Sequence, residues 1–313
     1  MVLSEAIARI GSRAVWWARH RETARDLDNA RLRFDRDLGW GWDEEERFRG
    51  RRDVPTEKAP DLFRAIAVGD SCTRGVGVHP VEAFPWQLEE MLRKQDPPLR
   101  VEVLNGGVKG YRSAQMADYL ERDLLAYAPD LAIVYANPLD GSDRPAGAGE
   151  LLSEIEWHRR RDAARENPAV EKMRRFLFRS RAYYLLRKFL AGTRETSEPL
   201  SVRETQQSKN LLRMRAACGS IGAEMIIVEY VVKKFEDGRD ALFAPDSNAR
   251  RPWEAPFVRV YPAMMESGYA AEELFQDGVH PTRAGHRIIA RLIAQKIDDL
   301  GLIAKEASER TAP

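Results

Sequence analysis

Three residues whose types and spacing could together perform acyl transfer lie in two short segments of this chain. Ser71 is in the segment Gly69-Asp-Ser71, directly after the small and apolar residues Ala65 to Val68. Asp277 and His280 lie three residues apart near the other end of the chain. A carboxylate can hold one nitrogen of an imidazole, so that the other nitrogen takes the proton of a serine hydroxyl and makes it a nucleophile. The combination predicts a site for hydrolysis through a serine.

Each segment also has a simpler interpretation. Ser71 could cap a helix while Asp70 closes a turn. In the same way, Asp277 could close a turn and His280 could cap the final helix. Position favours the catalytic interpretation, because Ser71 follows the first strand of an alternating strand and helix pattern, and such folds bind ligands at the carboxyl ends of their strands. Pro281 disfavours helical backbone geometry at His280, so we expect His280 at the start of the final helix and not inside it.

The elements that must position these residues follow a repeated strand and helix pattern. Short apolar runs predict buried strands, and apolar residues at helical spacing predict helices. Repeated units of this kind build a parallel sheet with helices on both faces. We expect strands at Arg64–Val68, Val101–Leu104, Leu131–Ala136, Glu224–Glu229 and Phe257–Val260, and helices near Pro85, after Ser113, at Ser201–Ile221 and at Pro281–Leu300.

Two further residues at the same edge of the sheet could stabilise a negative charge. Gly110 follows the second predicted strand, and Asn137 follows the third. A glycine can present its backbone N–H to a ligand because it has no Cβ, and the amide of asparagine is a neutral donor. An acyl-transfer site needs donors of this kind, aimed at the oxyanion that develops during the reaction.

With these residues the chain resembles the SGNH hydrolases, the serine esterases also called the GDSL family. The resemblance spans about residues 62–300 and implies a flavodoxin-like, three-layer α/β/α fold with a central parallel sheet of about five strands. It implies Ser71 as nucleophile, His280 as base and Asp277 as the residue that orients the base. It also implies an oxyanion hole made by the backbone N–H groups of Ser71 and Gly110 and by the side chain of Asn137. The matching blocks are Gly69-Asp70-Ser71, Asn105-Gly-Gly-Val-Lys-Gly110, Asn137 and Asp277-Gly-Val-His280.

The third block differs from the family pattern, in which a glycine and one further residue precede Asn-Asp. Here the block reads Tyr135-Ala136-Asn137-Pro138. The proline lacks a backbone donor and fixes its own backbone, so the loop that carries Asn137 can have a different shape. Asp140 could take the structural role of the missing aspartate.

Cysteine and histidine usage indicates neither a metal nor a cofactor, and we expect none. The two cysteines, Cys72 and Cys218, form no disulfide framework or zinc motif, and the five histidines show no metal-ligand spacing. Cys72 is a conceivable alternative nucleophile, because a thiol at a helix start can have a lowered pKa. Since Ser71 holds the motif position, we expect Cys72 to be a small buried residue.

Length and composition fit one main domain with appendages. The chain has 313 residues, of which 43% are hydrophobic and 32% charged. We expect an N-terminal helical arm and linker at residues 1–60, with a helix to about residue 36 and a loop at 38–52, then the hydrolase-like domain at 61–302 and a tail at 303–313. The net charge of +1 gives no reason to expect nucleic acid as a partner. Neither a signal peptide nor a run of ~18 apolar residues is evident, so we expect a cytoplasmic protein.

A helical insertion at about residues 145–200 is the basic part of the chain. Residues 151–190 contain 11 Lys/Arg against 5 Asp/Glu, a net charge of +6. The apolar residues there fall on two stripes of a helical wheel, Met173, Phe176, Leu177, Tyr183 and Tyr184 on one and Phe178, Leu185 and Phe189 on the other. One stripe can face the core, and the other needs a neighbouring helix, a second subunit, an anionic membrane surface or an acyl chain. A pair of helices within the monomer is the expectation.

The function that these residues predict is hydrolysis of a carboxylic oxyester, with a small-molecule, lipid or carbohydrate ester as substrate. Transfer of the acyl group to a sugar or another alcohol uses the same residues, and the sequence leaves this alternative open. A non-catalytic flavodoxin-like protein could instead bind phosphate with the loop after the first strand. Asp70 argues against phosphate, because a carboxylate beside the loop amides repels an anion. An interaction protein with a degenerate site is a third alternative, favoured by Pro138 alone.

Overall fold

The computed structural model describes residues 32–35, 38–42, 47–95, 100–136, 200–236, 239–244 and 255–303. The predicted insertion, with both of its apolar stripes, and most of the predicted N-terminal arm lie outside these residues. The domain boundaries near residues 60 and 302 stay predictions.

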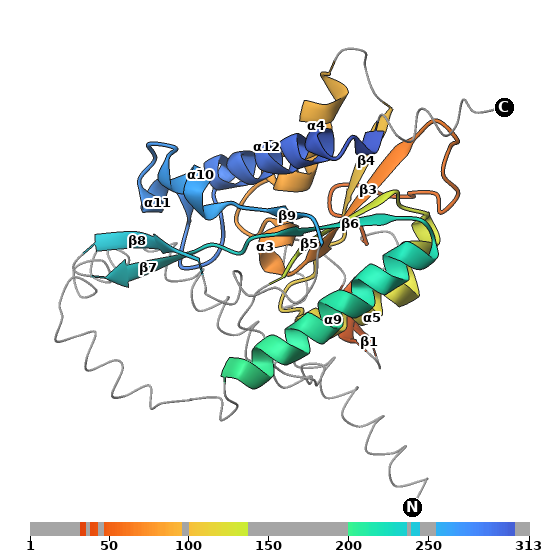
Figure 1. The fold of residues 1–313 in the computed structure, drawn as a ribbon, viewed down its shortest axis with the longest axis horizontal. Coiled ribbons are helices and arrows are strands. Elements are labelled where there is room, and N and C mark those ends of the chain that lie inside the picture. Colours follow the sequence, from red (N-terminus) through yellow and green to blue (C-terminus); the bar gives the residue numbers. More distant parts are fainter. Residues whose placement is uncertain are drawn as a thin grey trace, which may run out of the picture.

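A parallel sheet forms the centre of the fold (Figure 1). The order of its strands is β4-β3-β5-β6-β9, and every neighbouring pair is parallel. Numbered along the chain this is 2-1-3-4-5, the flavodoxin-like order, so the predicted α/β fold with five parallel strands is confirmed. All residues of β3 and β5 are buried, as expected for strands covered on both faces. The strands are β3 (Phe63–Gly69), β4 (Val101–Asn105), β5 (Leu131–Tyr135), β6 (Glu224–Val228) and β9 (Phe257–Val258).

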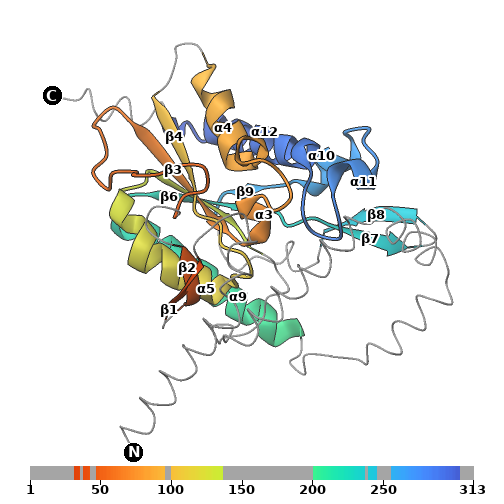
Figure 2. The same ribbon diagram turned by 180° about the vertical axis from the view of Figure 1, so that it is seen from behind.

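Helices cover both faces of the sheet and complete the three layers (Figure 2). One face packs against α4 (Phe84–Arg93) and α12 (Arg283–Asp299), and the other against α5 (Ser113–Tyr119) and α9 (Leu200–Ser220). Alternate residues of each strand point to opposite faces, so Ala65 and Ala67 of β3 join the first core while Ile66 and Val68 join the second. After α5 the chain continues through the π-helical segment η3 (Leu120–Leu124) and the short 3₁₀ helix η4 (Leu125–Tyr127).

The N-terminal segment differs from the prediction. Where we expected the end of a helix and a loop, β1 (Leu32–Asp35) and β2 (Gly39–Trp42) form an antiparallel hairpin, so the prediction is wrong for these residues. The Trp42 side chain is buried, and its Nε1 donates to the carbonyl of Gly107 at 3.3 Å. The guanidinium of Arg74 lies 3.8 Å from the centroid of the Trp42 ring. Contacts between residues distant in sequence therefore stabilise this hairpin, although its local sequence is typical of a glycine-rich loop.

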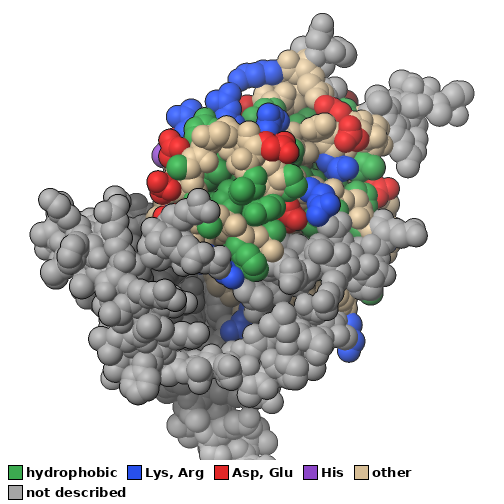
Figure 3. Space-filling model, turned by 60° about the vertical axis from the view of Figure 1, so that its left-hand side comes forward, with side chains coloured by type: hydrophobic (Ala, Val, Ile, Leu, Met, Phe, Trp, Pro, Cys, Tyr) green, Lys and Arg blue, Asp and Glu red, His purple; other side chains and the backbone are tan. Residues whose placement is uncertain are grey.

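A second hairpin, which we did not predict, follows β6. It consists of β7 (Val232–Glu236) and β8 (Arg239–Phe243), and β8 contacts the short helices α10 (Tyr261–Met265) and α11 (Ala271–Leu274). Figure 3 views the molecule from this side, and hydrophobic side chains gather near the centre of the described part of that face. Met265 and Tyr269, at the end of α10 and just before α11, are 56% and 51% exposed.

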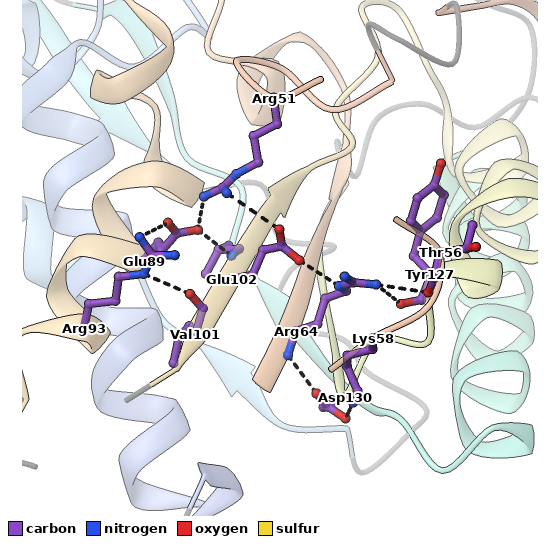
Figure 4. Close-up of polar contacts among 11 residues, drawn as sticks. Arg51, Thr56, Lys58, Arg64, Glu89, Arg93, Val101, Glu102, Tyr127 and Asp130 are labelled. Atoms are coloured by element: carbon purple, nitrogen blue, oxygen red, sulfur yellow. Dashed lines mark hydrogen bonds and ion pairs between the residues drawn. The ribbon is translucent and has the colours of Figure 1, made fainter. Parts of the chain in front are cut away.

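A cluster of charged residues ties the amino ends of the central strands together (Figure 4). The buried guanidinium of Arg64, on β3, donates to Glu102 Oε2 at 2.8 Å and to the carbonyl of Tyr127 at 2.7 Å. The backbone N–H of Arg64 donates to Asp130 Oδ2 at 2.7 Å, and Asp130 also binds Lys58. These contacts fix the end of β3 opposite to Ser71.

Glu89 of α4 extends this cluster to the helix layer (Figure 4). Its buried carboxylate accepts from the backbone N–H of Val103 at 2.8 Å and pairs with Arg93 at 3.0 Å and with Arg51. Arg51 in turn lies 3.6 Å from Glu102. The helix and the sheet edge are therefore joined by shared charges as well as by apolar packing.

Candidate active site

Ser71 is the first residue of a single helical turn, α3 (Ser71–Arg74), that starts where β3 ends. Asp70 caps this turn, because its Oδ1 accepts from the backbone N–H of Cys72 at 2.8 Å. Gly75 ends the turn in the left-handed region at φ 78°. The turn is packed so closely that a Cβ on Gly69 would lie 2.0 Å from Thr73 Oγ1. Strand end and turn therefore place the Ser71 side chain at the carboxyl edge of the sheet, half-buried.

The loop after β4 lies against this turn. The backbone N–H of Val108 donates to the carbonyl of Gly69 at 3.0 Å. A Cβ on Gly107 would lie only 2.3 Å from the backbone nitrogen of Arg74, so the two backbones approach to a distance that no larger residue permits. Gly110 lies two residues beyond Val108, half-buried and at φ 74°. The predicted donor Gly110 thus belongs to the loop that packs on the helical turn of Ser71.

His280 links Ser71 to Asp277 at this edge. His280 is buried, its Nε2 lies 2.9 Å from Ser71 Oγ, and its Nδ1 lies 2.8 Å from Asp277 Oδ2. Asp277 Oδ1 also accepts from the backbone N–H groups of Val279 at 2.9 Å and His280 at 2.8 Å. A carboxylate facing Nδ1 keeps the hydrogen on that nitrogen, so Nε2 is free to accept the hydrogen of the Ser71 hydroxyl.

Asp277 stays ionised in this arrangement. Partial burial by itself raises the pKa of Asp277, but the hydrogen bonds from His280 and Val279 and the nearby imidazole lower it well below its usual range. A permanently charged carboxylate can stabilise the imidazolium that forms when His280 takes a proton.

The loop that carries Asp277 and His280 is fastened to its surroundings on two sides. Gln276 Nε2 donates to the carbonyls of Val76 at 3.1 Å and Pro281 at 2.9 Å, and the backbone N–H of Gln276 donates to the carbonyl of His280 at 2.9 Å. From the other side, the backbone N–H of Lys233 on β7 donates to the carbonyl of Gly278 at 2.8 Å. The hairpin that we did not predict thus helps to hold the histidine loop.

Cys72 is fully buried, as expected. Burial and the adjacent Asp70 raise the pKa of its thiol well above the ordinary value. The thiol therefore keeps its hydrogen near neutral pH, and the alternative of a cysteine nucleophile loses its physical basis.

Of the five residues predicted for the site, the structure brings Ser71, His280 and Asp277 into hydrogen-bond distance and places Gly110 at the same edge. Asn137, like Asp140, lies outside the described residues. Sequence reasoning missed Tyr230, whose hydroxyl lies 3.2 Å from Asp70 Oδ2. Its position directly after the fourth predicted strand was the available signal.

The described part of the chain has no group of three or more His, Cys, Asp or Glu side chains that could hold a metal ion. None of the helices described is both long enough and apolar enough to cross a membrane.

No family model matches the chain, and no curated protein does. Similar solved structures include a GDSL-like lipase from Bacteroides thetaiotaomicron, at 17% identity and a TM-score of 0.45 over 79% of this chain and 92% of that one. An acetylxylan esterase from Geobacillus stearothermophilus is 15% identical, with a TM-score of 0.46 over 75% of this chain and 94% of that one. A two-domain esterase active on acetylated mannans is 16% identical, with a TM-score of 0.44 over 76% of this chain and 50% of that one. Similarity at this level transfers no activity.

Proposed function

We propose that this chain is a serine ester hydrolase of the SGNH type, with Ser71 as nucleophile, His280 as base and Asp277 as the group that orients the base. One observation carries the proposal. Ser71 Oγ, the His280 imidazole and the Asp277 carboxylate form a continuous series of contacts of 2.9 and 2.8 Å, although Ser71 and His280 are 209 residues apart in the sequence. The series lies at the carboxyl edge of a parallel sheet, where such folds bind their ligands.

In the first half of the reaction, Ser71 Oγ attacks the ester carbonyl while its proton passes to Nε2 of His280. The tetrahedral intermediate collapses when the bond between the carbonyl carbon and the alkoxy oxygen breaks, and His280 gives its proton to the departing alcohol. An acyl-enzyme on Ser71 remains.

In the second half, a water molecule attacks the acyl carbon and gives one proton to Nε2 of His280. The bond to Ser71 Oγ then breaks, the carboxylic acid leaves, and Ser71 recovers its proton from His280. An alcohol in place of water would complete an acyl transfer instead.

The oxyanion hole belongs to the same proposal. Its donors are the backbone N–H groups of Ser71 and Gly110 and the side-chain amide of Asn137. The support is the packing of the Gly110 loop on the turn of Ser71, with the Val108 N–H bound to Gly69 at 3.0 Å. Removing one such donor commonly costs about 10² to 10³ in kcat.

The direct test is hydrolysis of p-nitrophenyl esters of increasing acyl length, run beside acetylated sugars, with the wild type, Ser71→Ala and His280→Ala. We expect wild-type hydrolysis and a fall of at least about 10³-fold in kcat for both variants, with unchanged unfolding transitions. Ser220→Ala is the matched control, since Ser220 is exposed near the end of α9 and its hydroxyl donates only to its own helix, at Ala217. Wild-type rates in Ser71→Ala would refute the proposal.

Two additional measurements separate the alternatives. Including an alcohol acceptor and identifying the products distinguishes transfer from hydrolysis. A serine-directed phosphonofluoridate should add to Ser71 in the wild type, and the absence of both adduct and hydrolysis would favour a binding protein. The preference across the ester series then indicates whether the substrate is a small-molecule, lipid or carbohydrate ester. Contact of the basic insertion with an anionic membrane, one of the alternatives left open for its second apolar stripe, is tested by flotation with liposomes that contain or lack anionic lipid.

A further inference from the structure

Three buried polar side chains lie directly behind Ser71. Asp70 and Cys72 are its two neighbours in the sequence, and Tyr230 follows β6. The Tyr230 hydroxyl lies 3.2 Å from Asp70 Oδ2 and 3.0 Å from Cys72 Sγ. Cys72 Sγ in turn donates to the carbonyl of Val279 at 3.3 Å. Both neighbours of the nucleophile are thereby connected to the residue that precedes His280.

The hydrogen bonds and contacts of these groups form one continuous chain. The Tyr230 hydroxyl donates its one hydrogen to Asp70 Oδ2, and the Cys72 thiol donates its hydrogen to the carbonyl of Val279. Asp70 Oδ1 accepts from the backbone N–H of Cys72 at 2.8 Å, so the Asp70 carboxyl group accepts from both Tyr230 and Cys72. The contact of 3.0 Å between the Tyr230 hydroxyl and Cys72 Sγ joins these hydrogen bonds into one chain.

The surroundings of the three groups agree with this arrangement. Burial raises the pKa of Asp70, although its hydrogen bonds and the nearby His280 partly offset the effect. Burial also raises the pKa of Tyr230 and of Cys72 well above their ordinary values, so both retain their hydrogens near neutral pH.

We propose that Tyr230 is a positioning residue. It links Asp70 to Cys72, and Cys72 donates to the carbonyl of Val279, so the chain of contacts fixes the position of His280 relative to Ser71. The kinetic part of its test rests on the proposed function. Tyr230 touches neither of the reacting side chains in this role. It acts through the backbone on each side, because Asp70 and Cys72 bracket Ser71 and Val279 is bonded to His280.

The test compares Tyr230→Phe with Tyr135→Phe. Tyr135 is a matched control, because its ring centroid lies 4.9 Å from that of Tyr230, it is equally buried, and its hydroxyl is not part of the chain. Losing a buried hydrogen-bond link commonly costs about a factor of ten. We expect Tyr230→Phe to lower kcat about tenfold at a nearly unchanged KM, and Tyr135→Phe to leave both near the wild-type values.

Cys72 provides a second, independent variant with a conservative rescue. Cys72→Ala removes the link to Val279 and should also lower kcat about tenfold, whereas Cys72→Ser retains a donor and should restore most of the activity. Because both changes interrupt one chain, Tyr230→Phe combined with Cys72→Ala should be no worse than either alone. A combined loss of about a hundredfold would contradict a single chain.

A spectroscopic measurement reads the position of His280 without any substrate. In protein labelled with ¹⁵N-histidine, the Nδ1–H signal of His280 is assigned by its absence from His280→Gln. We expect this signal to shift and to exchange faster with water in Tyr230→Phe but not in Tyr135→Phe. Identical signals and identical kcat in the two variants would overturn the inference. If no ester is hydrolysed even by the wild type, the proposed function fails, and the ¹⁵N signal alone decides on Tyr230.

Discussion

Replacing Asp277 with asparagine separates the charge of this side chain from the shape of its loop. The amide oxygen can take the place of Oδ1 and accept from the backbone N–H groups of Val279 and His280, which lie at 2.9 and 2.8 Å. The amide nitrogen then occupies the place of Oδ2, 2.8 Å from His280 Nδ1, and donates to it. The imidazole hydrogen consequently moves to Nε2 and points at Ser71 Oγ. The loop keeps its shape, but Nε2, which should receive the serine proton, already carries a hydrogen.

We therefore expect a large loss of catalysis without a comparable loss of stability. A reversed tautomer costs about 10⁴ in kcat in a comparable triad, which corresponds to ~5 kcal/mol of transition-state stabilisation at about 1.4 kcal/mol per factor of ten. KM should stay close to the wild-type value, because the change affects the base and not the ester pocket. Steady-state hydrolysis of a p-nitrophenyl ester measures both constants, and urea unfolding measures stability.

Asp277→Ala is the control for this substitution. It removes the acceptor for both backbone N–H groups and should lower the free energy of unfolding more than Asp277→Asn does. A fall in kcat of less than tenfold in Asp277→Asn, with the loop still folded, would refute the assignment of Asp277 as the group that fixes the tautomer of His280.

Other predictions concern stability and packing. Burial lowers the pKa of His286 from 6.5 to about 3, so between these pH values the unfolded chain binds a proton that the folded chain does not, and unfolding becomes easier by up to about 1.4 kcal/mol per pH unit as the pH falls. Urea titrations at pH 7 and 5 should show this loss, and His286→Asn should reduce it; an unchanged loss would contradict the assignment. Gly107→Ala places a Cβ 2.3 Å from a backbone nitrogen of α3 and should lower the melting temperature and ester hydrolysis together, whereas Gly219→Ala meets nothing within 4 Å and should gain up to about 1 kcal/mol. Equal thermal scans for the two would refute the packing argument. Arg64→Met breaks a buried ion pair and should cost about 3 kcal/mol in urea unfolding, while Arg100→Met breaks an exposed pair and should cost less than about 1 kcal/mol. Similar losses would show that burial does not determine how much these ion pairs contribute to the free energy of unfolding.

The sequence predicted the central sheet because each parallel strand is a short apolar run that stands out from the charged helices around it. Once the strand ends are located, Ser71 and Gly110 fall at one edge without further information. His280 and Asp277 are less constrained, since nothing local shows how far they lie from Ser71. The prediction depended on their residue types and their spacing of three residues. The topology of the sheet is what brings them close to Ser71.

The elements that escaped prediction depend on contacts distant in sequence. The first hairpin reads as a loop because glycine alternates with tryptophan, and what fixes it is the packing of Trp42 against Arg74 and Gly107. Tyr230 reads as one more core aromatic, because only the fold brings its hydroxyl to Asp70. The second hairpin had one local signal that we did not use, the pair Asp237-Gly238, although the segments on either side contain lysine, glutamate and aspartate, which are depleted in strands.

The distance of 209 residues between Ser71 and His280 has a consequence for how the protein folds. Ser71 follows the central strand β3, whereas His280 precedes α12, which packs on the sheet. Contacts between residues so far apart along the chain are slow to form, because a long loop must close first. An intermediate can hold most of its helices and strands before these two side chains meet. During refolding, ester hydrolysis should therefore recover after the far-ultraviolet circular dichroism signal, and the enzymatic rate becomes a reporter of the last stage of assembly.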